Sequence, residues 1–271
     1  MTDPVQLRVP AERRDYTVAS VARALRVVDV VAEAGTDGLT LTELARQAGV
    51  SKSAGFAIAR TLVDAGYIRE VHPGPRYRLG LTLVRLGDRA VETHPLTELV
   101  KPVLHDLTRR TQMTARAAIN DDGYPMFISR VDAPGVIRFH APMGVRELPH
   151  SSAAGKAILA HLPESEAIRI AEETGLPART RRTITTVPGF LEDLRRTRER
   201  GFGIDDEEDE IGVYCLSAPV FGLHGGVFGA LSVTTIKTGA PERRAAELGG
   251  ILRRFAAQIT AQIAGRPRGR D

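Results

Sequence analysis

The sequence has no tryptophan, one cysteine and few aromatic residues, and each shortage excludes a class of protein. Aromatic residues make up 5% of the 271 residues, so aromatic cages and extensive base stacking are not expected. Cys215 alone forms neither an internal disulfide nor a cysteine-based zinc cluster. No run approaches the roughly 18 apolar residues of a membrane helix. Residues 1–16 carry mixed charges and two prolines instead of the apolar stretch of a secretory signal. We therefore expect a cytoplasmic protein with no membrane partner.

What is present points to two domains and to a polyanionic partner. A chain of this length exceeds the usual size of a single core, so about two domains are expected. The formal net charge is only +4, but residues 51–86 hold six basic and two acidic residues. A basic window beside a helical motif suits a nucleic acid. Arginine-rich solvated faces are the alternative.

Three helices are expected before residue 67. The first is capped by Ser20. The second begins at Thr40, which forms a capping box with Glu43. The third begins at Ser51, after a turn that contains glycine, and stops at Gly66. The apolar positions of the first helix, at helical spacing, are Val21, Leu25, Val28, Val31 and Ala32. Two helices joined by such a turn are the helix-turn-helix pattern.

A basic hairpin follows these helices. Residues 67–71 and 76–79 are strand-like, and His-Pro-Gly-Pro between them is a turn. Helix, capped helix, turn, capped helix and basic hairpin in this order predict a winged helix-turn-helix that binds DNA. A winged helix that serves only protein contacts is the alternative. The candidate DNA-binding residues are Thr42, Ser51, Lys52, Ser53, Gly55, Phe56, Arg60, Arg69, Arg76 and Arg78.

The rest of the chain has mixed α and β character, which makes the fold class α+β. Helices are expected at residues 81–93, 153–161, 164–174, 191–200 and 241–263. Strands are expected at residues 114–119, 125–131, 136–141, 214–220 and 227–235. The predicted organisation is a disordered arm (1–15), a winged helix-turn-helix (16–80), a linker helix (81–97), an effector-binding domain (98–264) and a disordered tail (265–271).

Several motifs resemble a known family. They are the block at residues 20–87 with Leu-Thr-Glu-Leu-Ala, the segment Pro-His-Ser-Ser-Ala-Ala-Gly-Lys-Ala at 149–157, and Gly-Phe-Gly-Ile-Asp-Asp-Glu-Glu at 201–208. The sequence resembles the IclR-type transcriptional regulators along nearly its whole length. The resemblance implies a GAF-like effector domain and homodimers or homotetramers that bind a double-stranded DNA operator. It also implies repression more often than activation, and organic or aromatic acids as effectors. No cofactor is expected.

The third helix departs from this family. Members usually carry Thr and Arg where this sequence has Ala54 and Ala57, and base readout needs side chains that donate or accept hydrogen bonds. Phe56 either touches a thymine methyl group or packs on the first helix. We therefore expect an atypical operator, with affinity that depends on phosphates and on the wing. The polar side chains left for base contacts are Lys52, Ser53 and Arg60.

A sensing site is expected where the helix at residue 153 begins. The segment lacks the glycine and hydroxyl spacing of a phosphate-binding loop, but free N–H groups at a helix start attract anions. Plain capping by Ser151 or Ser152 is the alternative. Alternation places Ser232 and Thr234 on one strand face. The resemblance carries over as effector-binding residues Ala153, Ala154, Asp205, Cys215, Ser232 and Thr234. Candidate apolar walls, with core packing as the alternative, are Val136, Phe139 and Met143.

The acidic run and the single cysteine each allow an alternative interpretation. Six acidic residues at 205–210 suit either a hard cation or a solvated loop, and the solvated loop is the simpler interpretation. Cys215 would be a nucleophile in an enzyme, but it lies mid-strand and no Gly-x-Ser-x-Gly motif accompanies it. We expect no enzyme. A ligand-binding protein with a degenerate DNA-binding helix is the second alternative.

Overall fold

The computed structural model describes residues 17–92, 95–136, 139, 143–237 and 244–264. The chain folds as two compact units that divide between Thr93 and His94, and each has a hydrophobic core of its own. The two domains expected from chain length are therefore present. The arm and the tail expected at residues 1–15 and 265–271 lie outside the described residues.

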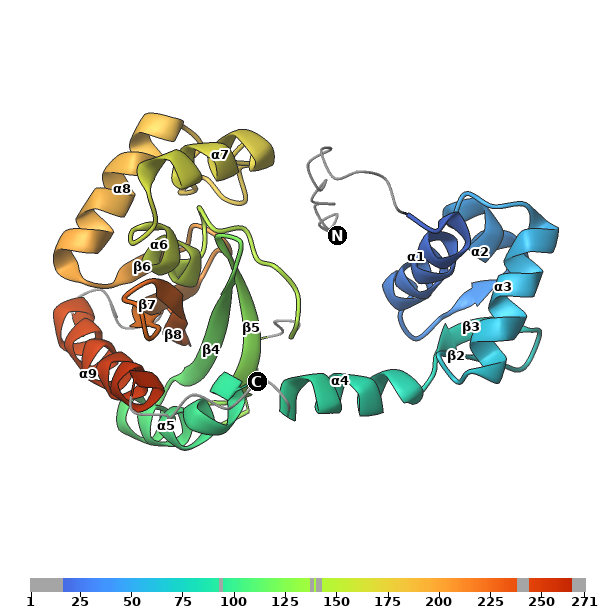
Figure 1. Ribbon diagram of the computed structural model, residues 1–271, viewed down its shortest axis with the longest axis horizontal. Coiled ribbons are helices and arrows are strands. Elements are labelled where there is room, and N and C mark those ends of the chain that lie inside the picture. The colour runs from blue at the N-terminus through green and yellow to red at the C-terminus, as the bar shows by residue number, and fades with distance from the viewer. Residues whose placement is uncertain (1–16, 93–94, 137–138, 140–142, 238–243, 265–271) are drawn as a thin grey trace. The chain divides into compact units, whose positions relative to one another are not determined.

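The N-terminal unit is a winged helix-turn-helix, as the sequence predicts. Its strands form a small antiparallel sheet in the order β1-β3-β2. The short strand β1 was not expected. Its elements (Figure 1) are α1 (Ala19–Glu33), β1 (Leu39–Thr40), α2 (Leu41–Gln47), α3 (Lys52–Asp64), β2 (Ile68–Val71), β3 (Arg76–Leu79) and α4 (Thr82–Glu92).

Side-chain caps define α2 and α3. The Thr40 hydroxyl accepts a hydrogen bond from the Glu43 backbone N–H, while the Glu43 carboxylate accepts one from the Thr40 backbone N–H at 2.8 Å. Ser51 caps α3 by accepting from the Ala54 N–H at 3.2 Å. Gly66 follows α3 with φ of +74°, the left-handed conformation that stops a helix. These predictions are confirmed.

The start and the buried face of α1 differ from the expectation. The helix begins at Ala19 after Val18, which provides no side-chain cap, so the predicted cap at Ser20 is wrong. The predicted apolar face is also partly wrong, because Val21 and Leu25 are more than half exposed. The residues that α1 buries are Val27, Val30 and Val31. Its N-terminal half therefore presents apolar side chains that the unit itself does not cover.

The C-terminal unit has a five-stranded antiparallel sheet in the order β5-β4-β8-β7-β6. Helices α5 and α9 cover one face of this sheet, α6 lies on the other face, and α7 and α8 pack on α6 (Figure 1). The elements are α5 (Pro95–Thr111), β4 (Thr114–Asp121), β5 (Tyr124–Val131), α6 (Ala153–Leu159), α7 (Glu164–Thr174), α8 (Val187–Arg200), β6 (Gly203–Asp206), β7 (Val213–Phe221), β8 (Val227–Ile236) and α9 (Ala245–Ala264).

In the C-terminal unit two elements were not expected, and one expected strand is not seen. Helix α5 was not expected and contains Pro102 in its interior, and strand β6 includes the first two residues of the acidic run. The strand expected at residues 136–141 falls mostly outside the described residues, and neither Val136 nor Phe139 is in a strand. The last helix was expected from residue 241, and residues 241–243 are likewise outside the described ranges.

Helix α6 lies directly against the backbone of its neighbours. A Cβ added at Gly155 would lie 2.3 Å from the Cα of Pro149, and one added at Gly203 would lie 2.3 Å from the Ala153 carbonyl oxygen. Real Cβ atoms do not approach other atoms so closely. Glycine at these two positions therefore lets the helix and the edge strand β6 meet.

We expect Gly203→Ala to destabilise the C-terminal unit, because the new methyl group collides with the Ala153 carbonyl. Overpacking of this kind costs typically about 1–3 kcal/mol. Thermal unfolding of the full chain measures the loss. Gly226→Ala is the matched control, because an added Cβ there meets no atom within 4 Å. Equal unfolding temperatures for the two variants would contradict the close approach of α6.

Candidate DNA interface and effector site

Helix α3 presents one exposed face with the polar residues expected from the sequence. Thr42 on α2 is exposed as well, and Arg60 makes an exposed ion pair with Asp64 at 3.6 Å. The exposed candidates on this face of α3 and its cap are Ser51, Lys52, Ser53, Phe56 and Arg60. The face therefore offers one lysine, one arginine and two serine hydroxyls to a ligand.

Two residues of α3 take different places from each other. The Phe56 side chain is 54% exposed, so packing on the first helix does not occupy it. Gly55 is buried, and a Cβ there would lie 3.1 Å from the Ala45 Cβ. Gly55 therefore allows close packing of α3 on α2 and does not face outward with the other candidates.

The three wing arginines also differ in their surroundings. Arg69 is exposed and Arg78 is half-buried. The Arg76 guanidinium donates hydrogen bonds to the carbonyl oxygens of Asp37 and Gly38 at 2.8 and 2.9 Å, and it lies 3.4 Å from the Glu43 carboxylate. Arg76 is therefore engaged in holding the wing to the start of α2, while Arg69 is the wing arginine most open to solvent.

In the C-terminal unit, the sheet face beneath α6 carries a row of buried polar side chains. The strand register places Cys215 opposite Thr234, and their Sγ and Oγ1 atoms lie 3.3 Å apart. The register also places Asp205 opposite Cys215. Ala153 and Ala154 are buried where α6 begins. The structure thus brings together the candidates from α6, β6, β7 and β8, with Ser232 beside them on the same face.

Asp205 is buried and its backbone contacts define a turn. One carboxylate oxygen accepts hydrogen bonds from the N–H groups of Glu208 and Asp209, at 2.8 and 3.3 Å. Burial raises the pKa of Asp205 to about 7, and these two hydrogen bonds oppose the rise. Near neutral pH this carboxyl group therefore exists in both protonation states.

The acidic run is not the solvated loop that was the simpler interpretation. Asp205 is 2% exposed and Glu208 is 9% exposed, and most of the remaining acids have basic partners. Asp206 pairs with Lys237 and Arg182. Among the described residues, no group of three acidic, histidine or cysteine side chains is arranged to hold a metal ion. The run is a charge-paired turn.

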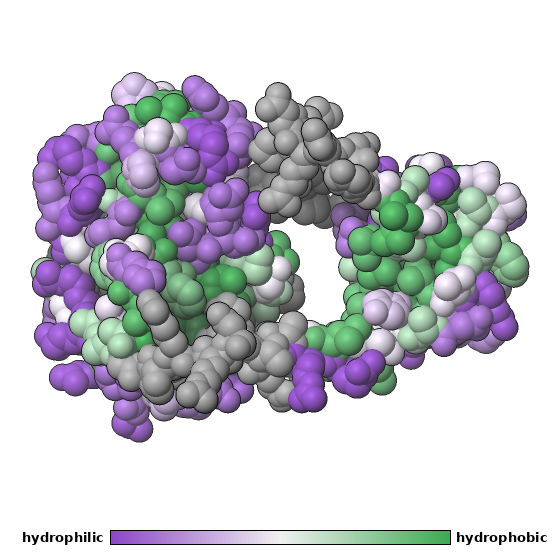
Figure 2. Space-filling view, in the orientation of Figure 1, coloured by the Kyte–Doolittle hydropathy of each residue, from purple (hydrophilic) through white to green (hydrophobic). Residues whose placement is uncertain are grey.

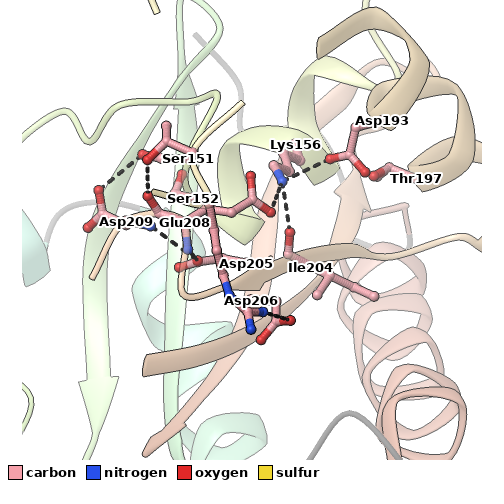
Figure 3. Close-up of polar contacts among 12 residues, drawn as sticks. Ser151, Ser152, Lys156, Asp193, Thr197, Ile204, Asp205, Asp206, Glu208 and Asp209 are labelled. Atoms are coloured by element: carbon pink, nitrogen blue, oxygen red, sulfur yellow. Dashed lines mark hydrogen bonds and ion pairs between the residues drawn. The ribbon is translucent and has the colours of Figure 1, made fainter. Parts of the chain in front are cut away.

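Lys156 is the central partner of this turn. Its side chain is fully buried, and Figure 3 shows the ammonium group pointing at three oxygen atoms. Nζ lies 2.5 Å from the Glu208 carboxylate, 2.8 Å from the Asp193 carboxylate and 3.1 Å from the Ile204 carbonyl oxygen. Lys156 therefore ties α6 to α8, to β6 and to the turn after β6.

Two serine side chains also form hydrogen bonds at the start of α6. The Ser152 hydroxyl caps the helix by accepting from the Gly155 N–H at 3.1 Å, and Ser151 donates to Asp209 at 3.0 Å. The capping alternative is thus present. Because α6 has only seven residues, its dipole is a weak source of anion affinity, and the polar sheet face is the better candidate.

The three proposed apolar walls are described residues that lie beside segments outside the described ranges. Val136 is 96% exposed and Met143 is 39% exposed, so neither packs in the core. Phe139 is half-buried, and its carbonyl oxygen accepts a hydrogen bond from Arg130. In this structure Val136 does not line the sheet face.

Comparison with known proteins agrees with both units. The family model for the IclR helix-turn-helix domain matches residues 20–72, and the model for the bacterial transcriptional regulator IclR C-terminal domain matches residues 88–261. The chain belongs to the IclR family. It is 31% identical to the transcriptional repressor IclR of Escherichia coli over 250 residues, which cover 92% of this chain and 91% of that protein.

Solved structures of IclR proteins have the same fold. An IclR regulator from Alicyclobacillus acidocaldarius is 29% identical with a TM-score of 0.78, and the match covers 92% of this chain and 100% of that one. An IclR homologue from Microbacterium hydrocarbonoxydans, solved with 4-hydroxybenzoate, is 21% identical with a TM-score of 0.76 over 91% of this chain and 100% of that one. The resemblance stated from the motifs is confirmed, and the chain is a DNA-binding transcriptional regulator.

The structure also bears on the alternative of a Cys215-dependent enzyme and on membrane association. Burial raises the pKa of the Cys215 thiol, which disfavours the thiolate that a nucleophilic cysteine needs. The IclR relatives are regulators of transcription. Of the helices in the described ranges, none is long and apolar enough to cross a membrane.

Arg116 is a residue of this face that sequence analysis missed. It lies on β4 opposite Ser232 of β8, is 7% exposed and pairs with Glu147 at 3.1 Å. A charged arginine within an expected strand is a candidate functional residue that the sequence itself shows. Its place beside Ser232 follows only from the pairing of β4 with β8.

We expect Asp205→Asn to change how stability depends on pH. The pKa of Asp205 rises from 3.8 to about 7 on folding, so the native state binds the proton more tightly than the unfolded chain. This contribution makes wild-type stability fall as pH rises from about 4 to about 7. Asparagine keeps the acceptor oxygen but does not titrate. Denaturant unfolding at a series of pH values should show the variant gaining on wild type by up to roughly 4 kcal/mol. Parallel profiles would contradict the raised pKa.

Proposed function

We propose that the protein is a sequence-specific repressor whose operator affinity is set by a small acidic effector bound beneath α6. The observation that supports this most directly is the buried polar face of the sheet. Two of its side-chain atoms, Ser232 Oγ and Arg116 Nε, have no hydrogen-bond partner in the described part of the chain. Buried polar groups normally have partners, so a ligand is the expected complement.

The DNA contacts are proposed to come from α3 and the wing. Lys52, Ser53 and Arg60 on the exposed face of α3 are the groups for base edges, and Arg69 is the group for phosphates. Ala54 and Ala57 donate no side-chain hydrogen bonds. Phosphate contacts should therefore supply a large share of the affinity, which makes binding strongly dependent on salt.

The effector is proposed to be an organic or aromatic acid. One homologue of known structure binds 4-hydroxybenzoate, and hydroxyl groups and an arginine on the sheet face of this chain suit a ligand with acceptor oxygens. The residues proposed to contact it are Ala153, Ala154, Asp205, Cys215, Ser232 and Thr234. Binding there would shift the equilibrium between two arrangements of the winged helices in the oligomer.

We propose a second copy of this chain as the partner of the apolar faces of α1 and α4. Val21 and Leu25 on α1 and Val84 on α4 are each more than half exposed. Figure 2 shows hydrophobic residues gathered over α1 and along α4. Exposed apolar patches of this kind favour association, and a dimer would present two recognition helices to a two-fold symmetric operator.

A footprint of the purified chain on the DNA flanking its own gene, at two salt concentrations, tests the proposal as a whole. A protected site with two-fold symmetry, weakened at the higher salt, is expected. No protection at low salt would show that the helix with Ala54 and Ala57 has lost DNA binding. The ligand-binding alternative would then be the better account.

We expect Arg60→Ala and Arg69→Ala each to weaken operator binding. Loss of a base contact costs about 1–3 kcal/mol, and loss of a phosphate contact lowers the salt slope by about one. Fluorescence anisotropy with the footprinted site measures both effects. Arg195→Ala on α8 is the matched control, because Arg195 also makes an exposed i,i+4 ion pair, with Glu199. Unchanged affinity in both test variants would rule out this docking.

We expect Ser232→Leu to abolish the effector response while operator binding remains. Leucine replaces the buried hydroxyl group of Ser232 with a larger apolar side chain. Ser232→Ala removes only the hydroxyl, so it separates loss of a contact from misfolding. Operator affinity with and without the effector measures the response. A response that survives in Ser232→Leu would place the effector elsewhere.

A further inference from the structure

The polar groups on the sheet face beneath α6 do not all have hydrogen-bond partners in the described ranges. The Thr114 hydroxyl accepts from the Ala133 N–H at 3.0 Å, Ser217 donates to the Leu231 carbonyl at 3.1 Å, and the Thr234 hydroxyl lies 3.3 Å from the Cys215 sulfur. Ser232 Oγ, in contrast, has no partner among the described residues. The side chain is 1% exposed, so bulk water does not satisfy it.

Arg116 also carries a buried polar atom without a hydrogen-bond partner in the part of the chain that the structure describes. Its Nη1 donates to Glu147 at 3.1 Å, but Nε is buried and lacks a partner in the described part of the chain. The guanidinium carbon lies 3.8 Å from the centroid of the Phe127 ring. The ring and the Glu147 carboxylate therefore fix the orientation of the guanidinium, while one N–H remains available.

Strand pairing makes the residues that carry the two unpaired atoms neighbours in the sheet. Arg116 and Ser232 are direct partners in the β4–β8 register. Directly opposed residues on an antiparallel pair have Cβ atoms about 4.5–5.5 Å apart and share a face. A group with two acceptor oxygens is thus able to receive a hydrogen bond from both. Arginine is the side chain best suited to such planar anions.

We propose that Arg116 is the specificity-determining residue of the effector site, and that its guanidinium binds a carboxylate of the effector together with the Ser232 hydroxyl. Glu147 is the internal counter-ion that competes for the same guanidinium. The proposal rests on the effector site of the proposed function and adds the residue that selects acids over neutral analogues.

Glu147 and Arg116 are expected to affect acid binding in opposite directions. A bound carboxylate and the Glu147 carboxylate repel each other across one guanidinium, so removal of the Glu147 charge strengthens acid binding. Removal of the guanidinium weakens it. If Arg116 and Glu147 merely held the fold together, both substitutions would weaken binding in parallel.

The test uses the full chain and four acids, each beside its primary amide: acetate, phenylacetate, benzoate and 4-hydroxybenzoate. Thermal stabilisation and calorimetry measure binding. At least one acid should bind the wild type and bind more tightly than its amide. Arg116→Lys keeps the positive charge but lacks the fork, and should weaken that acid about tenfold or more. Glu147→Gln should strengthen it.

Arg146→Lys is the matched control. Arg146 also pairs with a carboxylate, Asp121, and lies over a ring, Tyr124, but its Nε is occupied by Asp121. Its substitution should leave acid binding unchanged. The assignment of Arg116 is overturned if no acid binds, if acids and amides bind alike, or if Glu147→Gln weakens binding as Arg116→Lys does.

Operator affinity, measured in the same samples, separates this inference from the proposed function. An amide that binds at least as tightly as its acid and changes operator affinity would leave effector control standing and reject the role of Arg116. An acid that binds through Arg116 without changing operator affinity would support Arg116 as the acid-selecting residue and reject effector control.

Discussion

The buried ammonium group of Lys156 fixes the place of α6, and the candidate effector site depends on that placement. A fully buried lysine is tolerated only when its charge is paired. Here two carboxylates and a carbonyl oxygen surround it, and Asp193 is also 3.7 Å from the partly buried Arg200. Breaking a buried pair by removing one partner typically costs about 3–5 kcal/mol. The contacts therefore hold a seven-residue helix that would not be stable alone.

With α6 held in place, small residues decide how close it comes to the sheet. Gly155 and Gly203 allow backbone contact, and Ala154 and Ala157 pack in the apolar cluster around Phe127. The polar side chains that β4, β7 and β8 present on this face, among them Arg116, Ser217 and Ser232, are buried. An unsatisfied buried donor or acceptor costs about 1–3 kcal/mol, so a ligand that satisfies Ser232 and Arg116 relieves a cost already present in the free protein.

The sequence predicts elements well where the determining contacts are local. Thr40, Glu43, Ser51 and Gly66 act within one turn of their own positions, and the ends of α2 and α3 were accordingly predictable. Helix α5 was not predicted, and Pro102 in its interior is unfavourable to a helix locally. An interior proline costs about 3 kcal/mol, whereas burial of a Val or Leu side chain contributes roughly 1.5–3 kcal/mol. The apolar residues that α5 buries at helical spacing, which together outweigh that cost, are Leu96, Val100, Val103, Leu104 and Leu107.

The parts of the site that escaped prediction depend on contacts between distant segments. The acidic run looked solvated because its partners Lys156, Arg182 and Lys237 lie far away in the sequence. Arg116 could not be placed beside Ser232, because strand alternation fixes the face of a residue but not the identity of the neighbouring strand. The family resemblance supplied Asp205, Cys215 and Ser232 for the same site. The resemblance does not include Arg116 among the effector-binding residues it implies.

These contacts also indicate which segment an effector is able to influence. Regulation requires an effector to bind two states with different affinity, and a five-stranded sheet packed on both faces is a poor candidate for the moving part. The turn at residues 205–209 is a better one, because it contacts α6 twice, through Ser151 to Asp209 and through Lys156 to Glu208. Its cap is Asp205, whose charge changes near neutral pH. A ligand that contacts Asp205 therefore acts on the same polar network that positions α6, and typical allosteric couplings are only about 1–3 kcal/mol.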